Sequence, residues 1–515
     1  MPVEVVFTAK IRVKCLGIST GRRLVALSKR DAERLGFKVH DRVEVRASDR
    51  SATAIIVTSQ KLVSPGEAAV SEELAEDLGL KDGDEVVLRL AGLPESLMYI
   101  RKKMRGQRLS RREIYEIVKD VVEHHLTELE IAAFLLAEEF HGMSMEEIEY
   151  LTRAMAETGQ IVDFDRPVYD KHSIGGVPGN KVSLLIVPIV AASGLLIPKT
   201  SSKAITSPSG TANTMSMLAP VEFTAEELKE IALKAGGCIV WGGKLNIAPA
   251  DDIFIEVEHP LGVDPTSQML ASIMSKKLAV GVDNLVIDIP VGRGTKAETI
   301  SEGRRLAQMF VDLGKRVGIR VECGLTYGEQ PVGHAVGPAL EAREALIALC
   351  EPEKAPSSLV EKSTALAGML LEMGDKAPQG YGKDLAFDLL KSGKALSKMR
   401  EIIEAQGGDP DVKPEDIPVG QHRIAIEAPC NGYITGVDNS AIVAIARAAG
   451  APQEPGAGLT LSWKRGAKVR KGDAILEIYA ERESRLEEAY KLALKLKPIT
   501  VEGMLLHRVP EKQEY

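Results

Sequence analysis

The first ninety residues alternate apolar and polar positions, and the same pattern occurs twice. Residues 28–36 recur forty-three positions later as residues 71–79, and four further positions match: Lys38, Asp41, Val43 and Arg46 with Lys81, Asp84, Val86 and Arg89. Each copy is typical of a strand, a short helix closed by glycine, and a second strand. The repeat predicts a small two-fold β-barrel over residues 1–92, similar to the double-psi barrels. Because its alternation contains no cluster of catalytic side chains, we expect a structural or assembly role.

From residue 93 the apolar positions follow helical spacing instead. Four Ser/Thr residues, each followed three positions later by Glu, mark helix starts: Ser110 with Glu113, Thr127 with Glu130, Ser144 with Glu147, and Thr224 with Glu227. Gly159 and Gly236 supply stop signals. The pattern predicts a helical lobe over residues 93–160, which we expect to be joined by parts of residues 245–285.

Short β-branched segments alternate with helical segments further along the chain. Residues 286–289 and 319–323 read as strands on either side of a helix over residues 297–313. Such alternation indicates a mainly parallel sheet with helices on both faces, here over residues 161–406. A linker rich in Pro and Asp follows at residues 407–420, before an α+β domain over residues 421–515. The predicted fold class is therefore multidomain α/β, with an N-terminal β-barrel and a C-terminal α+β domain.

Composition limits the classes of ligand and the cellular compartment that we expect. The net charge of −8 leaves no global basic field for nucleic acid or an anionic membrane, so we expect small charged ligands. The five cysteines are far apart and odd in number, which argues against a disulfide framework or a thiolate metal site and favours a cytoplasmic location. The N-terminal residues do not resemble a signal peptide. The apolar run at residues 182–198 is too short for a membrane span and is predicted to be a buried core helix.

A glycine-rich loop at residues 170–181 is the sharpest chemical feature. It reads Asp-Lys-His-Ser-Ile-Gly-Gly-Val-Pro-Gly-Asn-Lys and lies between a predicted strand and the apolar helix. Three glycines allow backbone N–H groups to turn inward, and Lys171 and Ser173 add charge and a hydroxyl donor, so the loop can hold an oxyanion. A plain tight turn is the alternative. The spacing fits neither a Walker A loop nor a dinucleotide-binding fingerprint.

A second polar loop follows the next predicted strand, at residues 199–211. It carries seven hydroxyls and two lysines and no acidic residue. Alone, such a loop is usually a solvated turn. However, ligands of open α/β sheets bind outside the carboxyl ends of the strands, and two such loops at successive strand ends favour a phosphate-binding edge.

These loops, together with four further segments, resemble the thymidine/pyrimidine-nucleoside phosphorylase family. The segments are Leu-Asn-Ile-Ala-Pro-Ala-Asp-Asp at 245–252, Ser-Ile-Met-Ser-Lys-Lys at 272–277, Gly-Glu-Gln-Pro-Val-Gly at 328–333, and Val-Arg-Lys-Gly-Asp at 469–473. The resemblance spans about residues 95–505 and implies the fold of the class II nucleoside phosphorylases. Within the family the chain is similar to the archaeal branch that acts on AMP, because it has an extra N-terminal domain and a matching loop at residues 202–207. That branch implies phosphorolysis of AMP, and of other nucleoside 5′-monophosphates such as CMP and UMP, to a free base and ribose 1,5-bisphosphate.

The resemblance also implies roles for individual residues. The attacking phosphate is assigned to Lys171, Ser173, Ser183, Ser201 and Thr211. The nucleotide is assigned to Gly176, Ser202, Lys203, Ala204, Ile205, Thr206, Ser207, Thr211, Ser272, Lys276 and Lys296. Asp264 matches the proton donor. The scheme needs no metal and no cofactor, since inorganic phosphate is the co-substrate, and the family implies a homo-oligomer that is at least a dimer.

Two of these residues carry further expectations. Asp264 stands in the apolar segment Pro-Leu-Gly-Val-Asp-Pro, so we expect burial to raise its pKa and let it protonate the departing base. The nucleoside enzymes place an arginine seven residues before this aspartate, where this chain has Val257, which argues against pyrimidine-specific recognition. They also lack a counterpart of Lys296, and we hypothesise that Lys203 and Lys296 bind the 5′-phosphate.

Three alternatives stay open at this stage. A pyrimidine-nucleoside phosphorylase is the first. A phosphoribosyltransferase of the anthranilate type is the second, although no metal-binding acidic cluster for pyrophosphate can be placed. The third is a nucleotide sensor that kept the pocket and lost the chemistry, against which Lys171, Ser173 and Asp264 all stand.

Overall fold

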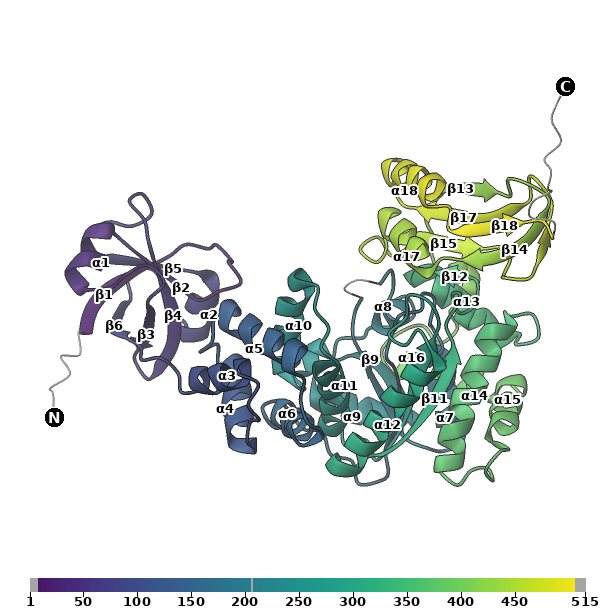
Figure 1. The fold of residues 1–515 in the computed structure, drawn as a ribbon, viewed down its shortest axis with the longest axis horizontal. Coiled ribbons are helices and arrows are strands. Elements are labelled where there is room, and N and C mark those ends of the chain that lie inside the picture. Colours follow the sequence, from purple (N-terminus) through teal and green to yellow (C-terminus); the bar gives the residue numbers. More distant parts are fainter. Residues whose placement is uncertain (1–7, 205–206, 505–515) are drawn as a thin grey trace. The chain divides into compact units, whose positions relative to one another are not determined.

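The structure is a computed structural model, which describes residues 8–204 and 207–504 (Figure 1). It divides into two compact units. The barrel unit comprises the residues up to His141 together with Glu256–Val263. The sheet unit comprises Gly142–Ile255 and the residues from Asp264 onward.

The barrel unit begins with a closed six-stranded barrel of strand order β1-β5-β2-β4-β3-β6 (purple in Figure 1). Its strands are β1 (Thr8–Cys15), β2 (Leu24–Leu27), β3 (Arg42–Ala47), β4 (Arg50–Thr58), β5 (Glu67–Val70) and β6 (Glu85–Leu90). Apolar side chains from all six strands fill the interior. The parallel pairs β1–β5 and β2–β4 are equivalent under the sequence repeat. The barrel predicted from the repeat is therefore confirmed.

The short helices of the repeat end where the glycines predict. Helices α1 (Lys29–Leu35) and α2 (Glu72–Leu78) are each followed by a glycine in the left-handed region, Gly36 at φ 75° and Gly79 at φ 65°. Glycine adopts this conformation without the Cβ clash that other residues meet there.

Three helices complete the barrel unit: α3 (Ser96–Met104), α4 (Arg111–Val122) and α5 (Glu128–His141). The predicted capping box of α4 is present, with both Ser110–Glu113 bonds formed. Two ion pairs join the barrel to α5, namely Arg22 with Glu128 and the more buried Arg42 with Glu130. Because exposed pairs contribute little, Arg42–Glu130 is the more important of the two.

The sheet unit is built on parallel strands in two hydrogen-bonded groups. Strand β10 (Asn284–Val291) lies between β11 (Arg320–Tyr327) and β7 (Tyr169–Ser173), while β8 (Ile197–Ser201) pairs with β9 (Gly237–Trp241). A parallel bridge between Val168 and Leu196 connects the two groups. The predicted parallel α/β sheet is confirmed, and the carboxyl ends of β7 and β8 lie at the same edge.

The apolar run after β7 forms a shorter helix than its sequence predicts. Helix α7 (Ser183–Ala192) is buried along its length, as expected of a core helix. It ends at Ser193, Gly194 turns the chain at φ 87°, and β8 starts at Ile197. No helix among the described residues is long and apolar enough to cross a membrane.

The further helices of the sheet unit are α6 (Met145–Glu157), α8 (Thr211–Met215), α9 (Ala225–Ala235), α11 (Thr266–Ala279), α12 (Ile300–Val317), α13 (Pro338–Cys350), α14 (Ser357–Met373), α15 (Gly382–Lys391) and α16 (Lys394–Ala405). Helix α10 (Pro249–Leu261) is divided between the units after Ile255. The predicted capping boxes of α6 and α9 are present. Helix α12 begins three residues later than predicted, because a capping box between Thr299 and Glu302 fixes its start.

The C-terminal part is an α+β layer that shares a sheet with the rest of the unit (yellow in Figure 1). One sheet has the order β12-β15-β17-β13 and the other β16-β14-β18, with helices α17 (Asn439–Ala448) and α18 (Glu483–Leu496). The strands are β12 (Ala335–Val336), β13 (His422–Glu427), β14 (Gly432–Val437), β15 (Gly458–Leu461), β16 (Lys468–Val469), β17 (Ala474–Ala480) and β18 (Ile499–Glu502). Because β12 precedes α13, the α+β layer is anchored to the parallel-sheet domain by backbone hydrogen bonds. The predicted fold class is thus confirmed in full, while the exact domain boundaries stay predictions.

Buried polar groups reinforce that junction. The ammonium of Lys181, which is fully buried, donates to the carbonyl oxygens of Val332 and Ala335 at 3.0 Å each and to Glu344 Oε2 at 2.5 Å. A buried lysine is tolerated when its donors are satisfied in this way.

Candidate active site

The site is built at the carboxyl edge of the parallel sheet, where β7 and β8 end. Lys171 and Ser173 belong to the last three residues of β7, and Ser201 is the last residue of β8. Ser183 is the first residue of α7, and Thr211 is the first residue of α8. The topology therefore brings all five residues assigned to phosphate to one edge of the sheet.

The glycine-rich loop runs against a second loop that follows β10. Gly175, Gly176 and Gly179 adopt φ angles of 92°, 87° and 71°, so the loop depends on glycine at these positions. A Cβ atom at Gly176 would lie 2.9 Å from the Cα of Thr295 and 3.3 Å from the backbone nitrogen of Lys296. The predicted nucleotide residues Gly176 and Lys296 are therefore neighbours.

One buried carboxylate, that of Asp288 on β10, joins the groups around Lys171. Its Oδ2 lies 2.9 Å from Lys362 Nζ and 3.7 Å from Lys171 Nζ. Asn180 Nδ2 donates both to this oxygen, at 3.2 Å, and to Ser173 Oγ, at 2.9 Å. Burial by itself would raise the pKa of Asp288, but Lys362 and Lys171 outweigh it and hold that pKa well below its usual range. Burial lowers the pKa of Lys171 to about 8, although Asp288 opposes the shift.

A second buried cluster lies on the opposite face of β7. Side chains of a strand alternate between faces, so Asp170 and His172 point away from Lys171 and Ser173. Asp170 pairs with Lys277 at 2.5 Å and with Lys199 at 3.8 Å. Burial, reinforced by Lys277 and Lys199, lowers the pKa of His172 well below its usual value. His172 is therefore neutral, and the alternation does not place it with the predicted phosphate residues.

The second loop is described except for Ile205 and Thr206, which lie outside the described residues. Ser202 is exposed, and the Ala204 amide donates to Asn213 Oδ1 at 2.7 Å. Ser207 Oγ donates to the carbonyl of Ser209 at 3.1 Å.

Lys203 faces two residues that the sequence did not point to. Its ammonium lies 4.0 Å from the centroid of the Trp241 ring and 2.6 Å from Glu222 Oε1. The ammonium of Lys203 therefore already has an aromatic and an acidic partner.

Helix α11 carries two more predicted residues on one face, Ser272 and Lys276, which are one helical turn apart. Lys276 forms an ion pair with the fully buried Asp251 of α10. Burial would lower the pKa of Lys276, but Asp251 outweighs it and the pKa is raised. Lys276 is therefore a fixed positive charge.

The environment expected for Asp264 is wrong. Its side chain is 56% exposed rather than buried, and it forms an ion pair with Lys296. The apolar neighbours in sequence do not cover the carboxylate, because Asp264 lies in the turn just before α11. The predicted proton donor and the predicted 5′-phosphate lysine are thus brought together, whereas Val257 is buried in α10.

Four charged residues of these buried pairs received no role from the sequence: Asp251, Asp288, Lys277 and Lys362. For Asp288 a signal existed, because a lone charge inside the apolar strand of residues 285–289 needs a buried partner. Lys362 gave no signal, since a lysine on a helix is usually solvated.

One group of described side chains has the composition of a metal site, which the sequence did not suggest. Ligand atoms of Asp120, Glu123 and His125 in the barrel unit lie within 4.8 Å of one another. His125 Nδ1 is 3.0 Å from Asp120 and 3.3 Å from Glu123. The hydrogen bond to Asp120 raises the pKa of His125, and both carboxylates lie within ion-pairing distance of its ring.

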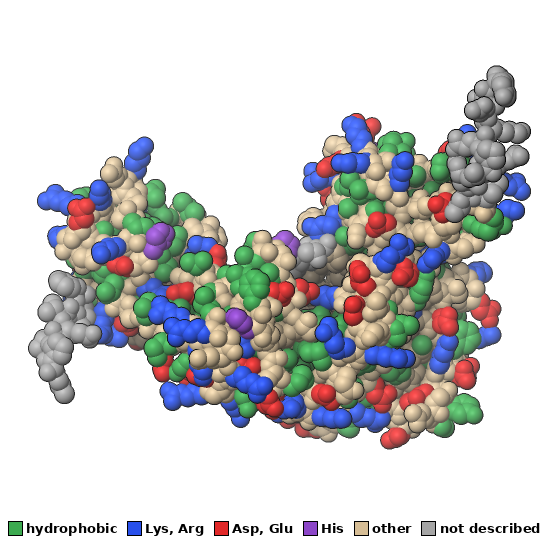
Figure 2. All heavy atoms as spheres, in the orientation of Figure 1, with side chains coloured by type: hydrophobic (Ala, Val, Ile, Leu, Met, Phe, Trp, Pro, Cys, Tyr) green, Lys and Arg blue, Asp and Glu red, His purple; other side chains and the backbone are tan. Residues whose placement is uncertain are grey.

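Charges on the surface are mixed rather than segregated. Figure 2 shows Lys and Arg interspersed with Asp and Glu over the face that it draws. This distribution suits a local anion site better than a nucleic-acid-binding surface.

Comparison with known proteins gives consistent matches. Residues 98–159 match the helical bundle domain of a glycosyl transferase family, residues 165–396 match its a/b domain, and residues 433–500 match the pyrimidine nucleoside phosphorylase C-terminal domain. The AMP phosphorylase of Thermococcus kodakarensis is 51% identical over 501 residues, covering 97% of this chain and 99% of that protein. The AMP phosphorylase of Methanosarcina acetivorans is 51% identical over 503 residues, with the same coverage. Among solved structures, an anthranilate phosphoribosyltransferase from Thermus thermophilus has a TM-score of 0.49 and 21% identity, covering 60% of this chain and 98% of that chain.

Proposed function

The chain belongs to the AMP phosphorylases, a branch of the pyrimidine nucleoside phosphorylase family, and from this premise we propose how it cleaves AMP with inorganic phosphate. The enzyme is a pentosyltransferase. A phosphate oxygen forms a bond to the anomeric carbon of ribose, and the electrons of the bond to adenine leave with the base. The products are adenine and ribose 1,5-bisphosphate, and CMP and UMP are further substrates of the same reaction.

The attacking phosphate binds at the edge formed by β7, α7, β8 and α8. Lys171 supplies charge, while the hydroxyls of Ser173, Ser183, Ser201 and Thr211 supply directional donors. Positive charge that is in place before the reaction stabilises the charge of the transition state without reorganisation. Neither a metal nor an organic cofactor enters this scheme.

Once Lys296 has moved to the 5′-phosphate, the freed Asp264 carboxylate takes up a proton from solvent and passes it to the departing adenine. An acid placed near a ring nitrogen accelerates departure by typically 10²–10⁴-fold. The carboxylate is paired with Lys296, so the substrate has to separate the two. The 5′-phosphate of AMP carries more negative charge than Asp264 and attracts Lys296 away from it. The observation that carries this part of the proposal is the Asp264–Lys296 ion pair beside Gly176.

The first test measures adenine release from AMP and from adenosine, each with and without inorganic phosphate. We expect release from AMP only, dependent on phosphate, with a doubly phosphorylated pentose as the second product. Activity confined to nucleosides would identify a nucleoside phosphorylase instead. Binding of AMP without release of base would identify a sensor.

A second test addresses Lys296 itself. Lys296→Ala should raise the KM for AMP at least tenfold. Arg293→Ala is the matched control, because it removes a positive charge from the same loop, where Arg293 is largely exposed and paired with Glu329. Unchanged activity of Lys296→Ala on AMP, with adenosine still unused, would refute the assignment of the 5′-phosphate to Lys296.

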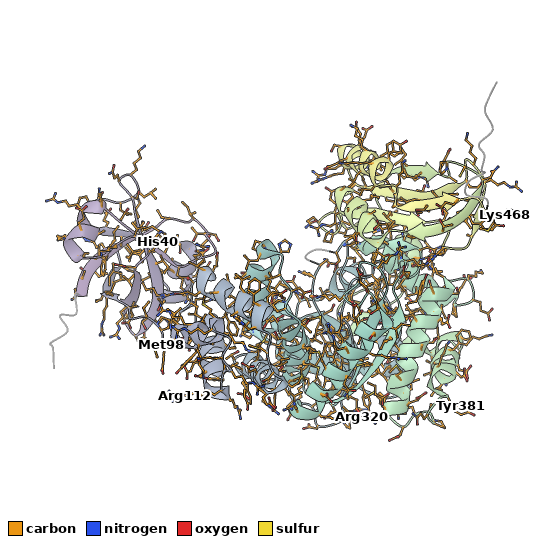
Figure 3. All side chains as sticks on the ribbon, in the orientation of Figure 1. His40, Met98, Arg112, Arg320, Tyr381 and Lys468 are labelled. Carbon is orange, nitrogen blue, oxygen red and sulfur yellow. The ribbon has the colours of Figure 1, made fainter. Side chains whose placement is uncertain are left out.

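The active enzyme is proposed to be a cytoplasmic homo-oligomer, at least a dimer. Helices α3 and α5 expose large apolar side chains: Met98 is 60% exposed (labelled in Figure 3), Leu129 80% and Phe140 77%. Because α3 and α5 pack against each other, we place the interface on these two helices. All five cysteines are free, as suits a reducing compartment. Light scattering of the purified chain tests the oligomer: a monomer mass at working concentration would refute it.

A further inference from the structure

Lys362 lies beside the proposed phosphate site, although neither the sequence nor the family resemblance pointed to it. It is carried by α14, which packs against β7, β10 and β11. Its side chain is only 8% exposed, and its ammonium lies 2.9 Å from Asp288 Oδ2. A buried lysine at this distance from a buried carboxylate is a strong interaction whose loss leaves an unpaired charge.

Two lysines and two neutral polar groups surround the carboxylate of Asp288, and they do not all lie equally close to it. Thr326 Oγ1 donates a hydrogen bond to Asp288 Oδ1 at 2.6 Å, while Lys362 and Asn180 both contact Asp288 Oδ2. Lys171 approaches the same Oδ2 only to 3.7 Å, which is longer than a hydrogen bond. Lys171 is consequently ion-paired with the carboxylate without a hydrogen bond to it.

We propose that Lys362 is a positioning residue that engages Asp288 and thereby leaves the ammonium of Lys171 available to the attacking phosphate. This inference rests on the proposed function, in which Lys171 binds phosphate. Without Lys362, Asp288 becomes a buried carboxylate with one nearby cation, and it draws Lys171 from the 3.7 Å ion pair into a direct hydrogen bond. Without Asp288, the two lysines repel each other in a buried site, and Asn180 loses one of its two acceptors beside Ser173.

The charge on Lys171 responds to both partners. Its charged neighbours are Asp288 on β10, Lys362 on α14 and Asp170 on its own strand. Lys362 lowers the pKa of Lys171 and Asp288 raises it. Removing Lys362 should therefore move the alkaline limb of the pH profile for phosphate binding upward, and neutralising Asp288 should move it downward.

The experiment uses the full chain and initial rates of adenine release, with phosphate varied at saturating AMP and AMP varied at saturating phosphate. Lys362→Met should raise the KM for phosphate at least tenfold and change the KM for AMP less than twofold. Lys362→Arg, which keeps the charge, should restore most of the phosphate affinity. The control is Lys383→Met, which breaks the exposed pair of Lys383 with Glu361, the residue next to Lys362 on α14.

A double variant separates charge from packing. Asp288→Asn alone should also raise the KM for phosphate, whereas Asp288→Asn combined with Lys362→Met removes both charges and should recover affinity relative to either single variant. The idea is overturned if Lys362→Met leaves the KM for phosphate unchanged, or if the double variant is no better than the singles. Should variants at Asp288 fail to fold, the comparison of Met with Arg at position 362 still decides the question. If the unmodified chain needs no phosphate to release adenine, the proposed function fails instead.

Discussion

Gly176 is the residue at which a single methyl group should test the geometry of the site. It lies at φ 87° and packs against the backbone of Thr295. Its neighbour Gly175 lies at φ 92°, and a Cβ atom added there would meet nothing within 4 Å. Both alanine variants carry the same conformational cost, about 1–2 kcal/mol for a left-handed residue. They differ only in the contact with Thr295.

The expected loss of activity in Gly176→Ala follows from that contact. A Cβ at position 176 would lie 2.9 Å from Thr295 Cα and 3.1 Å from Thr295 Cβ, whereas carbon atoms pack at about 3.5–4.0 Å. One of the two loops has to move by several tenths of an ångström, and the loop that moves carries either the predicted phosphate residues or Lys296. Misplacement of about 1 Å can cost roughly 10²-fold in rate. We therefore expect Gly176→Ala to lose about 10–100-fold in kcat/KM for AMP.

The assay is phosphate-dependent adenine release by both variants, with thermal unfolding measured alongside. Gly175→Ala should lower stability to a similar extent and lose less than threefold in kcat/KM. Equal kinetic losses in the two variants would refute the reasoning, because they would show that backbone strain, and not the contact with Thr295, controls the site.

Three further outcomes are expected. Asp264→Asn should lower kcat for adenine release by about 10²–10³-fold, and a loss below threefold would exclude Asp264 as the proton donor. The KM for phosphate should rise as pH increases through about 8, because Lys171, whose pKa burial lowers to about 8, loses its proton there; a KM that stays flat from pH 7 to 9 would contradict this. Burial raises the pKa of Glu341 to about 7, so the folded state retains a proton that the unfolded state releases at lower pH, and stability is lost as pH rises through 7. Glu341→Gln should therefore stabilise the protein by roughly 3 kcal/mol at pH 8 and by less than about 1 kcal/mol at pH 5, and equal effects in denaturant unfolding at both pH values would argue against it.

Local signals explain which parts of the fold could be predicted. Helix starts at Ser110, Ser144 and Thr224 follow from residues three positions apart, and these capping boxes form in the structure. The barrel followed from a repeat that is visible in the chain itself. The sequence predicts too late an end for α7, because apolar composition does not distinguish a buried helix from the buried strand that follows it.

The candidate site residues also divide into those that short segments of sequence reveal and those that only the fold brings together. The two loops could be found because glycines and hydroxyls are concentrated within short segments. The exposure of Asp264 could not, because its partner Lys296 lies on another loop and apolar neighbours in sequence do not imply burial in space. Lys362 and Asp288 meet only through the packing of α14 on β10, for which no short-range pattern exists.

The two ion clusters on either face of β7 also determine how that strand can pair. A shift of one residue turns every side chain of a strand to the other face. Such a shift would place Lys171 among Lys199 and Lys277, and Asp170 against Asp288. Like charges would then meet in the buried cluster on each face of β7. In most strands an error of this kind is opposed by misplaced apolar groups, but here it is opposed by charge. The buried charges around the proposed phosphate site therefore also oppose a one-residue shift of β7 during folding.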